Sequence, residues 1–304
     1  MSKPNLNVEV CGVKFKNPLI AASGTYGFGR EFNKLYDIAT LGGISVKGLT
    51  LKPRLGNPPS RIAETPMGML NSVGLQNPGV DAFIAEELPW LRQRDLAVIA
   101  NIAGSTVDDY CQMAEKFQNQ PVEMLELNIS CPNVKEGGVA FGTRPESILE
   151  ITRQVKRHAM QSLMVKLSPN VADIGEAALA AQEGGADAIS LINTLTGMAV
   201  DVYKRRPILA NVTGGLSGPA VKPVALRMVY QASHKVKIPV VGMGGIMTGE
   251  DVAAFMLCGA SAVMVGTANL ADPMACPRIL REFEEYLART QVSCASDLVG
   301  KLEV

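Results

Sequence analysis

Short apolar runs alternate with amphipathic stretches along most of the chain. Apolar runs of about four to eight residues between turn signals are typical of buried strands, and longer stretches with a helical apolar period are typical of helices. We predict strands at residues 18–23, 43–47, 97–101, 122–129, 163–167, 187–193, 238–242 and 261–266. We predict helices near residues 30–38, 79–92, 106–119, 145–160, 172–183, 219–235, 249–258 and 275–290. Strands that alternate with helices indicate an α/β protein with a parallel sheet.

The number of strand–helix units decides which α/β fold is expected. Eight units can close on themselves, so the sequence predicts a (β/α)8 barrel of the TIM type. Before the first unit, residues 7–15 are predicted to form an N-terminal β-hairpin that turns at Cys11 and Gly12. A doubly wound dinucleotide-binding fold is the alternative, but residues 242–247 put Met247 where its glycine fingerprint needs the last glycine. With no linker or repeat, one domain over residues 1–304 is expected.

Two connections are longer than the fold requires. Residues 48–77 are rich in glycine and proline and have no clear helix or strand pattern, and residues 195–217 form the second long connection. Long loops in compact domains usually have functional roles, so both are expected to take part in a site. A shorter loop over residues 132–142 contains Gly137 and Gly138 and could act as a hinged lid.

Composition narrows the class of partner. Apolar residues make up 47% of the 304 residues, and 29 Lys and Arg balance 29 Asp and Glu, so no net charge favours nucleic acid or a membrane surface. The six cysteines are scattered without a C-x-x-C pair, which argues against a metal or iron–sulfur site in this chain. No apolar targeting or membrane-spanning segment is present in the sequence. A cytoplasmic protein with reduced thiols is therefore expected.

Polar residues and glycines collect at the carboxyl ends of the predicted strands, where active sites of such barrels lie. The group comprises Ser23, Lys47, Gly48, Asn101, Asn128, Cys131, Asn133, Lys166, Ile192, Asn193, Thr194, Gly244, Gly245, Gly266 and Thr267. The glycines after the last two strands favour a phosphate cradle, because backbone N–H groups there can approach an anion closely. Four asparagines from separate segments match the alternating N–H and C=O groups of a pyrimidine ring; they are Asn71, Asn128, Asn133 and Asn193.

Several of these residues have a second interpretation that the sequence leaves open. Cys131 follows a strand and precedes Pro132, so it is either a buried small side chain or an active thiol. Lys166 either pairs with Glu126 on the neighbouring strand or lies beside a group that gains negative charge, such as a reduced flavin. Lys47 could likewise lie beside a group that gains negative charge, or it could bind a substrate carboxylate.

The motifs in this chain resemble those of the dihydroorotate dehydrogenases. The resemblance covers nearly the whole chain and rests on residues 71–77 (NSVGLQN), 128–133 (NISCPN), 192–194 (INT), 213–218 (TGGLSG) and 242–245 (GMGG). Residues 195–198 (LTGM) and 204–207 (KRRP) are similar to the NAD-linked branch. Membrane-attached members have serine as the base, whereas this chain has Cys131.

The resemblance implies a role for each matching position. It implies FMN contacts at Ser23, Lys47, Gly48, Asn101, Asn128, Lys166, Ile192, Gly218, Gly244, Gly245, Gly266 and Thr267. It implies substrate contacts at Lys47, Asn71, Ser72, Val73, Gly74, Leu75, Asn128, Asn133, Asn193 and Thr194. Cys131 matches the catalytic base, and Lys47 is the second residue assigned to catalysis.

The expected function is FMN-dependent oxidation of dihydroorotate to orotate in pyrimidine biosynthesis. In the NAD-linked branch, a partner subunit carries FAD and a [2Fe-2S] cluster, and two catalytic chains form the homodimer core of a heterotetramer. Three alternatives stay open: a fumarate-linked or dihydropyrimidine-reducing relative, a Schiff-base lyase that uses Lys166, and a barrel that binds a phosphorylated ligand without catalysis.

Overall fold

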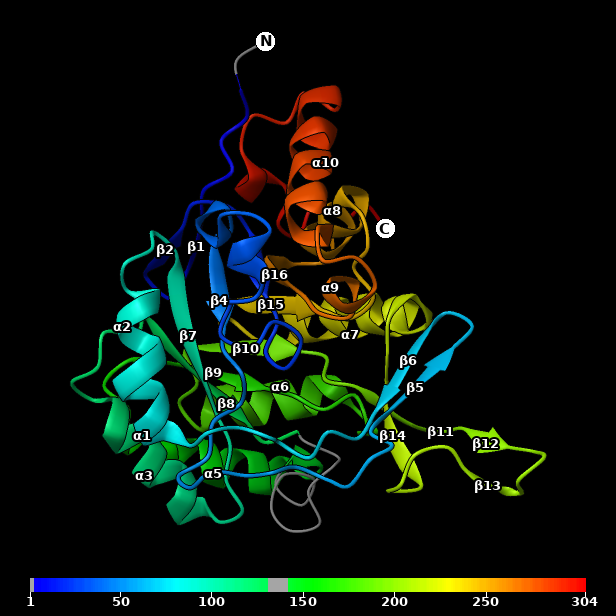
Figure 1. The fold of residues 1–304 in the computed structure, drawn as a ribbon. Coiled ribbons are helices and arrows are strands. Elements are labelled where there is room, and N and C mark those ends of the chain that lie inside the picture. Colours follow the sequence, from blue (N-terminus) through cyan, green and yellow to red (C-terminus); the bar gives the residue numbers. More distant parts are fainter. Residues whose placement is uncertain (1–2, 131–141) are drawn as a thin grey trace.

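The computed structural model describes residues 3–130 and 142–304, and its centre is a closed barrel of eight parallel strands (Figure 1). The barrel order is β10-β15-β16-β3-β4-β7-β8-β9, so the first barrel strand, β3, closes against the last, β16. The strands are β3 (Leu19–Ala21), β4 (Gly43–Ser45), β7 (Ala97–Ile102), β8 (Met124–Asn128), β9 (Ser162–Lys166), β10 (Ala188–Leu191), β15 (Val240–Met243) and β16 (Ala260–Val265). Each lies inside or overlaps a predicted strand, which confirms the (β/α)8 barrel.

Burial on both faces explains why these strands are continuous apolar runs. Every residue of β7 and β8 is buried, because helices cover the outside of the barrel and side chains fill its interior. Polar side chains in these strands are therefore exceptions that need partners. Four of them are completely buried, namely Ser45, Asn101, Glu126 and Ser190.

Helices surround the barrel. They are α1 (Val80–Ala82), α2 (Leu88–Leu91), α3 (Val107–Phe117), α5 (Pro145–His158), α6 (Ile174–Glu183), α7 (Lys222–Lys235), α8 (Gly249–Leu257), α9 (Ala268–Ala271) and α10 (Ala275–Arg289). All but the short α9, which was not predicted, lie in or overlap predicted helices. A π-helical turn, η3 (Phe83–Glu87), joins α1 to α2. Capping boxes begin two of the helices, with Thr106 and Asp109 at α3 and Thr248 and Asp251 at α8.

The helix predicted near residues 30–38 is wrong. The segment forms two short 3-10 turns, η1 (Phe32–Lys34) and η2 (Ile38–Thr40). The Asp37 side chain accepts a hydrogen bond from the backbone N–H of Ala39, 3.0 Å away, and Asn33 accepts one from Ile38. Such local side-chain bonds compete with helical ones and stop the helix.

The N-terminal hairpin is confirmed in its register. Strand β1 (Val8–Val10) pairs antiparallel with β2 (Val13–Phe15), with Val8 opposite Phe15 and Val10 opposite Val13. The turn lies at Cys11 and Gly12, both with positive φ.

The two long connections are not irregular loops, in contrast to the prediction. Together they build a four-stranded antiparallel sheet in the order β11-β14-β6-β5. The first connection gives β5 (Ile62–Thr65) and β6 (Gly68–Asn71), and the second gives β11 (Leu195–Met198) and β14 (Thr213–Ser217). A further hairpin of β12 (Val200–Asp201) and β13 (Arg206–Pro207) extends from this sheet (Figure 1).

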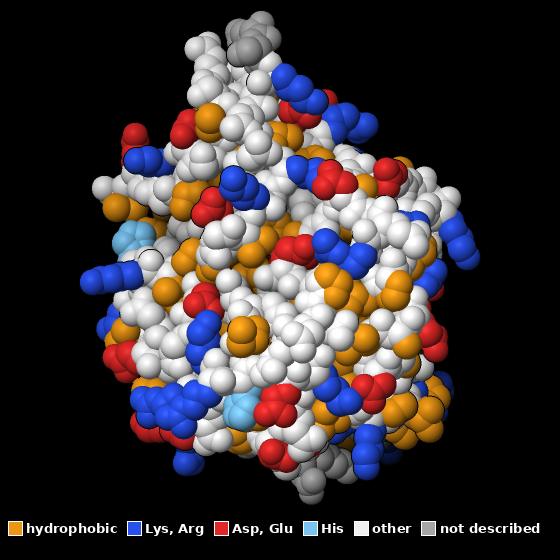
Figure 2. Space-filling model, turned by 90° about the vertical axis from the view of Figure 1, so that its left-hand side faces the viewer, with side chains coloured by type: hydrophobic (Ala, Val, Ile, Leu, Met, Phe, Trp, Pro, Cys, Tyr) orange, Lys and Arg blue, Asp and Glu red, His pale blue; other side chains and the backbone are white. Residues whose placement is uncertain are grey.

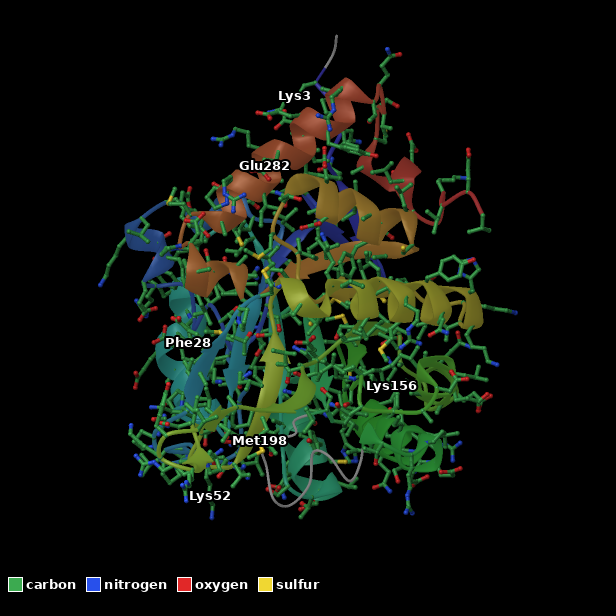
Figure 3. All side chains as sticks on the ribbon, turned by 90° about the vertical axis from the view of Figure 1, so that its right-hand side faces the viewer. Lys3, Phe28, Lys52, Lys156, Met198 and Glu282 are labelled. Atoms are coloured by element: carbon green, nitrogen blue, oxygen red, sulfur yellow. The ribbon has the colours of Figure 1, made fainter. Side chains whose placement is uncertain are left out.

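The sheet lies at one end of the molecule, away from the chain termini. In Figure 3, Lys52 and Met198, one from each long connection, lie at the end opposite Lys3 and Glu282. The sheet has a small apolar cluster of its own, made of Ala63, Leu70 and Leu209, whereas one large cluster joins the barrel to its helices.

The outer surface carries both signs of charge. On the face shown in Figure 2, Lys and Arg side chains are interspersed with Asp and Glu. Within the described residues, no helix combines the length and apolar character that a membrane crossing requires.

Candidate active site

A cavity of about 260 Å³ lies between the carboxyl ends of the barrel strands and the antiparallel sheet. Most of the residues predicted for the site line it; they are Ser23, Lys47, Gly48, Asn71, Val73, Leu75, Asn128, Lys166, Ile192, Asn193, Thr194, Gly218, Gly244, Gly245, Gly266 and Thr267. Segments far apart in the sequence therefore meet at one place, as the barrel topology requires.

Next to the carboxyl ends of β15 and β16, the cavity wall includes the backbone of four residues that follow these strands. Gly244 and Gly245 adopt positive φ of 125° and 79°, a conformation that favours glycine. Within the described residues, the backbone N–H groups of Gly244, Gly245, Gly266 and Thr267 have no protein acceptor. A Cβ at Gly266 would come no closer than 3.6 Å to the protein and would occupy cavity space instead. This part of the cavity wall can therefore hold an anionic group against backbone N–H donors.

Lys166 supplies a buried positive charge to the cavity wall. It is only 5% exposed, and among the described residues no ion pair joins it to an acidic side chain. The sequence left open an ion pair between Lys166 and Glu126, but the described residues do not form it. The Glu126 carboxylate instead accepts hydrogen bonds from Ser45, Asn101 and Ser190. A buried ammonium is costly without an anion, so the cavity suits a ligand that carries or gains negative charge near Lys166.

Lys47 also lines the cavity and is half-buried. It follows β4, whereas Lys166 ends β9, so the two ammonium groups come from separate strands. Two cations in one cavity allow one to face a cofactor and the other a substrate carboxylate.

Three of the four predicted asparagines lie at the cavity. The Asn128 amide donates to Asn101 Oδ1 over 3.3 Å, and the Asn193 amide donates to Ser130 Oγ over 2.7 Å. Asn71, at the end of β6, donates to the backbone carbonyl of Gly215 on β14 over 3.3 Å. Each side chain is thus held by the protein in one orientation. Neutral amides fixed in this way suit a ligand ring with both N–H and C=O groups.

A few predicted residues do not line the cavity. Asn101 is fully buried behind Asn128, and Ser72 is 1% exposed with its Oγ 3.4 Å from Asn57 Nδ2. Gly74 packs against Asn57, where a Cβ would come within 2.5 Å. Cys131 and Asn133, together with the proposed lid at Gly137 and Gly138, lie outside the described residues.

The sequence missed most of the apolar lining. Ile62, Met69 and Leu216 come from the antiparallel sheet, and Leu270 comes from α9. The elements that carry them are only four or five residues long, so no period marked them as elements facing a site. Ser130, which bonds to both Asn128 and Asn193, was also missed, although it lies inside the motif at residues 128–133.

Four of the five described cysteines differ from a thiol prepared for catalysis. All five are unpaired: Cys11, Cys111, Cys258, Cys276 and Cys294. Burial raises the pKa of Cys11 to about 11 and that of Cys276 to about 12, and it also raises the pKa of Cys111 and of Cys258. A thiol with a raised pKa stays protonated at neutral pH and is a poor base.

Known proteins are similar to this chain over nearly its whole length. Residues 5–287 match the family described as dihydroorotate dehydrogenase. The chain belongs to the dihydroorotate dehydrogenase family. A protein of Alkaliphilus oremlandii is 56% identical over 302 residues, which cover 99% of this chain and 100% of that protein. A protein of Geotalea daltonii is 54% identical over 305 residues and 100% of both chains.

A third dihydroorotate dehydrogenase, from a Thermoanaerobacter species, is 54% identical over 300 residues and 99% of each chain. All three relatives are described as "Dihydroorotate dehydrogenase B (NAD(+)), catalytic subunit". The identification made from the motifs, including the NAD-linked branch, is therefore confirmed.

Proposed function

We propose that this chain is the catalytic subunit of an NAD-linked dihydroorotate dehydrogenase and oxidises dihydroorotate to orotate in pyrimidine biosynthesis. The observation that carries the proposal is the buried Lys166 ammonium, which lines the same cavity as the fixed amides and the backbone N–H groups that have no acceptor within the described residues. A flavin phosphate and a pyrimidine carboxylate together match these features. One domain spanning residues 1–304 is proposed, because one apolar core joins the barrel to its helices.

The residues present fit FMN. The N–H groups of Gly244, Gly245, Gly266 and Thr267 would hold the phosphate, and Lys166 would lie at the ring edge where negative charge develops. The further proposed contacts are Ser23, Lys47, Gly48, Asn101, Asn128, Ile192 and Gly218; Asn101 acts from behind Asn128. When bound, FMN supplies the hydride acceptor of the reaction.

Dihydroorotate would be held by the amides on the sheet side of the cavity. Asn71, Asn128, Asn193 and Thr194 would bind the ring, and Lys47 would bind the carboxylate. Fixed side chains of this kind orient the ring so that C5 and C6 face their reaction partners. The further proposed contacts are Ser72, Val73, Gly74, Leu75 and Asn133.

Cys131 is proposed as the base that removes a proton from C5 while hydride leaves C6. The assignment rests on the family motif at residues 128–133. It is supported by Ser130, the preceding residue, which is buried two residues after β8 and hydrogen-bonded to Asn128 and Asn193. General bases typically contribute a factor of about 10²–10⁴ to the rate.

Electrons must leave this chain to reach NAD. The relatives are described as catalytic subunits, which supports a partner subunit, and we propose that this partner carries FAD and a [2Fe-2S] cluster. A homodimer of the catalytic chain inside a heterotetramer, acting in the cytoplasm, completes the proposal. The NAD(+) in the relatives' description favours this reading over a fumarate-linked enzyme.

The test is anaerobic mixing of dihydroorotate with the FMN-loaded chain. The flavin colour should bleach, and Cys131→Ala should slow bleaching by about 10²–10⁴. Cys294→Ala is the matched control, because Cys294 is a half-buried thiol outside the cavity lining, and it should bleach at the wild-type rate.

Equal bleaching by Cys131→Ala and wild type would remove Cys131 from the mechanism. A colourless wild-type chain that is trapped by borohydride with a carbonyl substrate would instead favour the Schiff-base lyase. A chain that binds FMN but is not bleached would favour the non-catalytic barrel.

A further inference from the structure

The fully buried carboxylate of Glu126 has no role in the proposed chemistry, yet three donors converge on it. Ser45 Oγ and Asn101 Nδ2 each lie 2.6 Å from Oε2, and Ser190 Oγ lies 2.7 Å from Oε1. In its ionised form a carboxylate only accepts hydrogen bonds, and all three contacts are of that kind. No salt bridge joins it to a cation within the described residues, so ion pairing does not explain why a carboxylate is there.

A chain of hydrogen bonds leads from Glu126 to the cavity. Asn101 donates to Glu126, so its carbonyl oxygen points the other way and accepts from Asn128 Nδ2 at 3.3 Å. Asn128 Oδ1 in turn accepts from Ser130 Oγ at 3.2 Å. Ser130 Oγ accepts from Asn193 Nδ2 at 2.7 Å. Every donor in this series points toward Glu126.

The direction of this series of hydrogen bonds decides which donors and acceptors the cavity presents to a ligand. Asn128 uses one amide N–H for Asn101, which leaves its other N–H as a donor at the cavity. Asn193 uses its amide N–H groups on Ser130, which leaves its carbonyl oxygen, already accepting from the backbone N–H of Thr194, as the acceptor. If the series ran in reverse, donor and acceptor would be exchanged at these positions.

We propose that Glu126 is a positioning residue. It fixes which end of each amide, N–H or C=O, faces the substrate ring at Asn128 and Asn193. Because an ionised carboxylate cannot donate, the Asn101 amide that contacts it must present its N–H group, and this orientation passes through Asn128 and Ser130 to Asn193. The cavity then offers one donor and one acceptor to a ring with C=O and N–H groups. This inference rests on the proposed function, since the ring is that of orotate.

The test compares Glu126→Gln with Ser190→Ala in the FMN-loaded chain. Glutamine has nearly the shape of glutamate but can donate, so Asn101 and the residues beyond it lose their fixed orientation. Ser190→Ala removes a bond to the same carboxylate and leaves the series from Asn101 to Asn193 intact. Orotate dissociation constants are measured from the change in flavin absorbance, together with FMN content and melting temperature.

The expected result is that Glu126→Gln weakens orotate binding by about tenfold or more, as for other buried hydrogen-bond mismatches. The KM for dihydroorotate should rise by the same factor, with FMN content unchanged and a smaller change in the rate at saturating substrate. Ser190→Ala should bind orotate within about twofold of wild type. If Glu126→Gln does not fold, Asn101→Ala breaks the series while keeping the carboxylate and should weaken orotate binding similarly.

Orotate binding by Glu126→Gln that matches Ser190→Ala would overturn the inference, as would a loss of FMN affinity with orotate binding unchanged. Both outcomes leave the proposed function intact. A wild-type chain that neither binds orotate nor is bleached by dihydroorotate would overturn the proposed function and this inference with it.

Discussion

Lys166 shows how a single residue can indicate the charge of a ligand. Its ammonium is buried at the end of β9 and faces the cavity, while the nearest strand's carboxylate, Glu126, is already bound by three other donors. An anion that binds beside such a buried ammonium offsets its desolvation cost, so the anion is itself stabilised there. Lys166 should therefore make a bound flavin easier to reduce, because reduction adds negative charge.

Lys166→Gln should lower the midpoint potential of the bound FMN by about 30–60 mV. This range corresponds to the loss of one charged contact of about 1.5–3 kcal/mol in a two-electron couple. Lys156→Gln is the control, because Lys156 pairs with Asp187 at 2.5 Å and does not line the cavity. The measurement is a reductive titration, and equal potentials in the three proteins would contradict the role given to Lys166.

At the residue scale, the sequence predicted which side chains gather but not how they bond. Gly244, Gly266 and Asn193 could be placed because strand ends of a barrel converge. The contacts of Asn101 and Ser130 depend on amide directions, which follow from three-dimensional neighbours and have no sequence period. The donor-to-acceptor direction of the hydrogen bonds that end at Glu126 could be found only from the structure.

At the scale of elements, the barrel strands were predictable and the antiparallel sheet was not. Barrel strands such as β7 are buried on both sides and therefore stand out as apolar runs. Strands β6 (GMLN) and β14 (TGGLS) have few apolar residues, and they pair with each other across a long separation in sequence. Their structure comes from tertiary pairing, which overrides the weak local preference.

Gly68→Ala should damage this sheet more than the barrel. A Cβ at Gly68 would lie 2.0 Å from the backbone oxygen of Ser217, so β6 and β14 would have to separate. We expect orotate binding to weaken by about tenfold or more, since Asn71 and Met69 would move, while the melting temperature falls by only a few degrees.

The control for this substitution is Gly12→Ala, whose added Cβ meets no atom within 4 Å and whose strain is confined to the N-terminal turn. It should bind orotate as wild type does. Both proteins are measured by orotate titration and thermal unfolding. A Gly68→Ala protein that binds orotate normally would show that the sheet does not shape the substrate side.

At the scale of the whole molecule, the described residues form one cavity at the carboxyl ends of the barrel strands, and the proposed function gives it one half of a redox reaction. The sequence has no dinucleotide fingerprint, and the relatives are described as one subunit of an NAD(+)-linked enzyme. The FMN-loaded chain alone should therefore be bleached by dihydroorotate but should not reduce NAD.

Addition of the electron-transfer subunit of a close relative should restore NAD reduction by at least about tenfold over the chain alone, measured as NADH formation. The control is the Cys131→Ala chain with the same subunit, which should stay slow because proton removal limits it. Fast NADH formation by the catalytic chain alone would contradict the need for a partner.

The sheet over the cavity also constrains when the site can form during folding. Asn71 and Gly215, which bond across β6 and β14, are separated by 144 positions in the sequence. Closing so long a segment is entropically costly, so such contacts form late in folding. A nascent chain that has not yet emerged beyond residue 217 therefore has six of the eight barrel strands but no covered cavity. Ligands would stabilise the finished molecule without guiding its early folding.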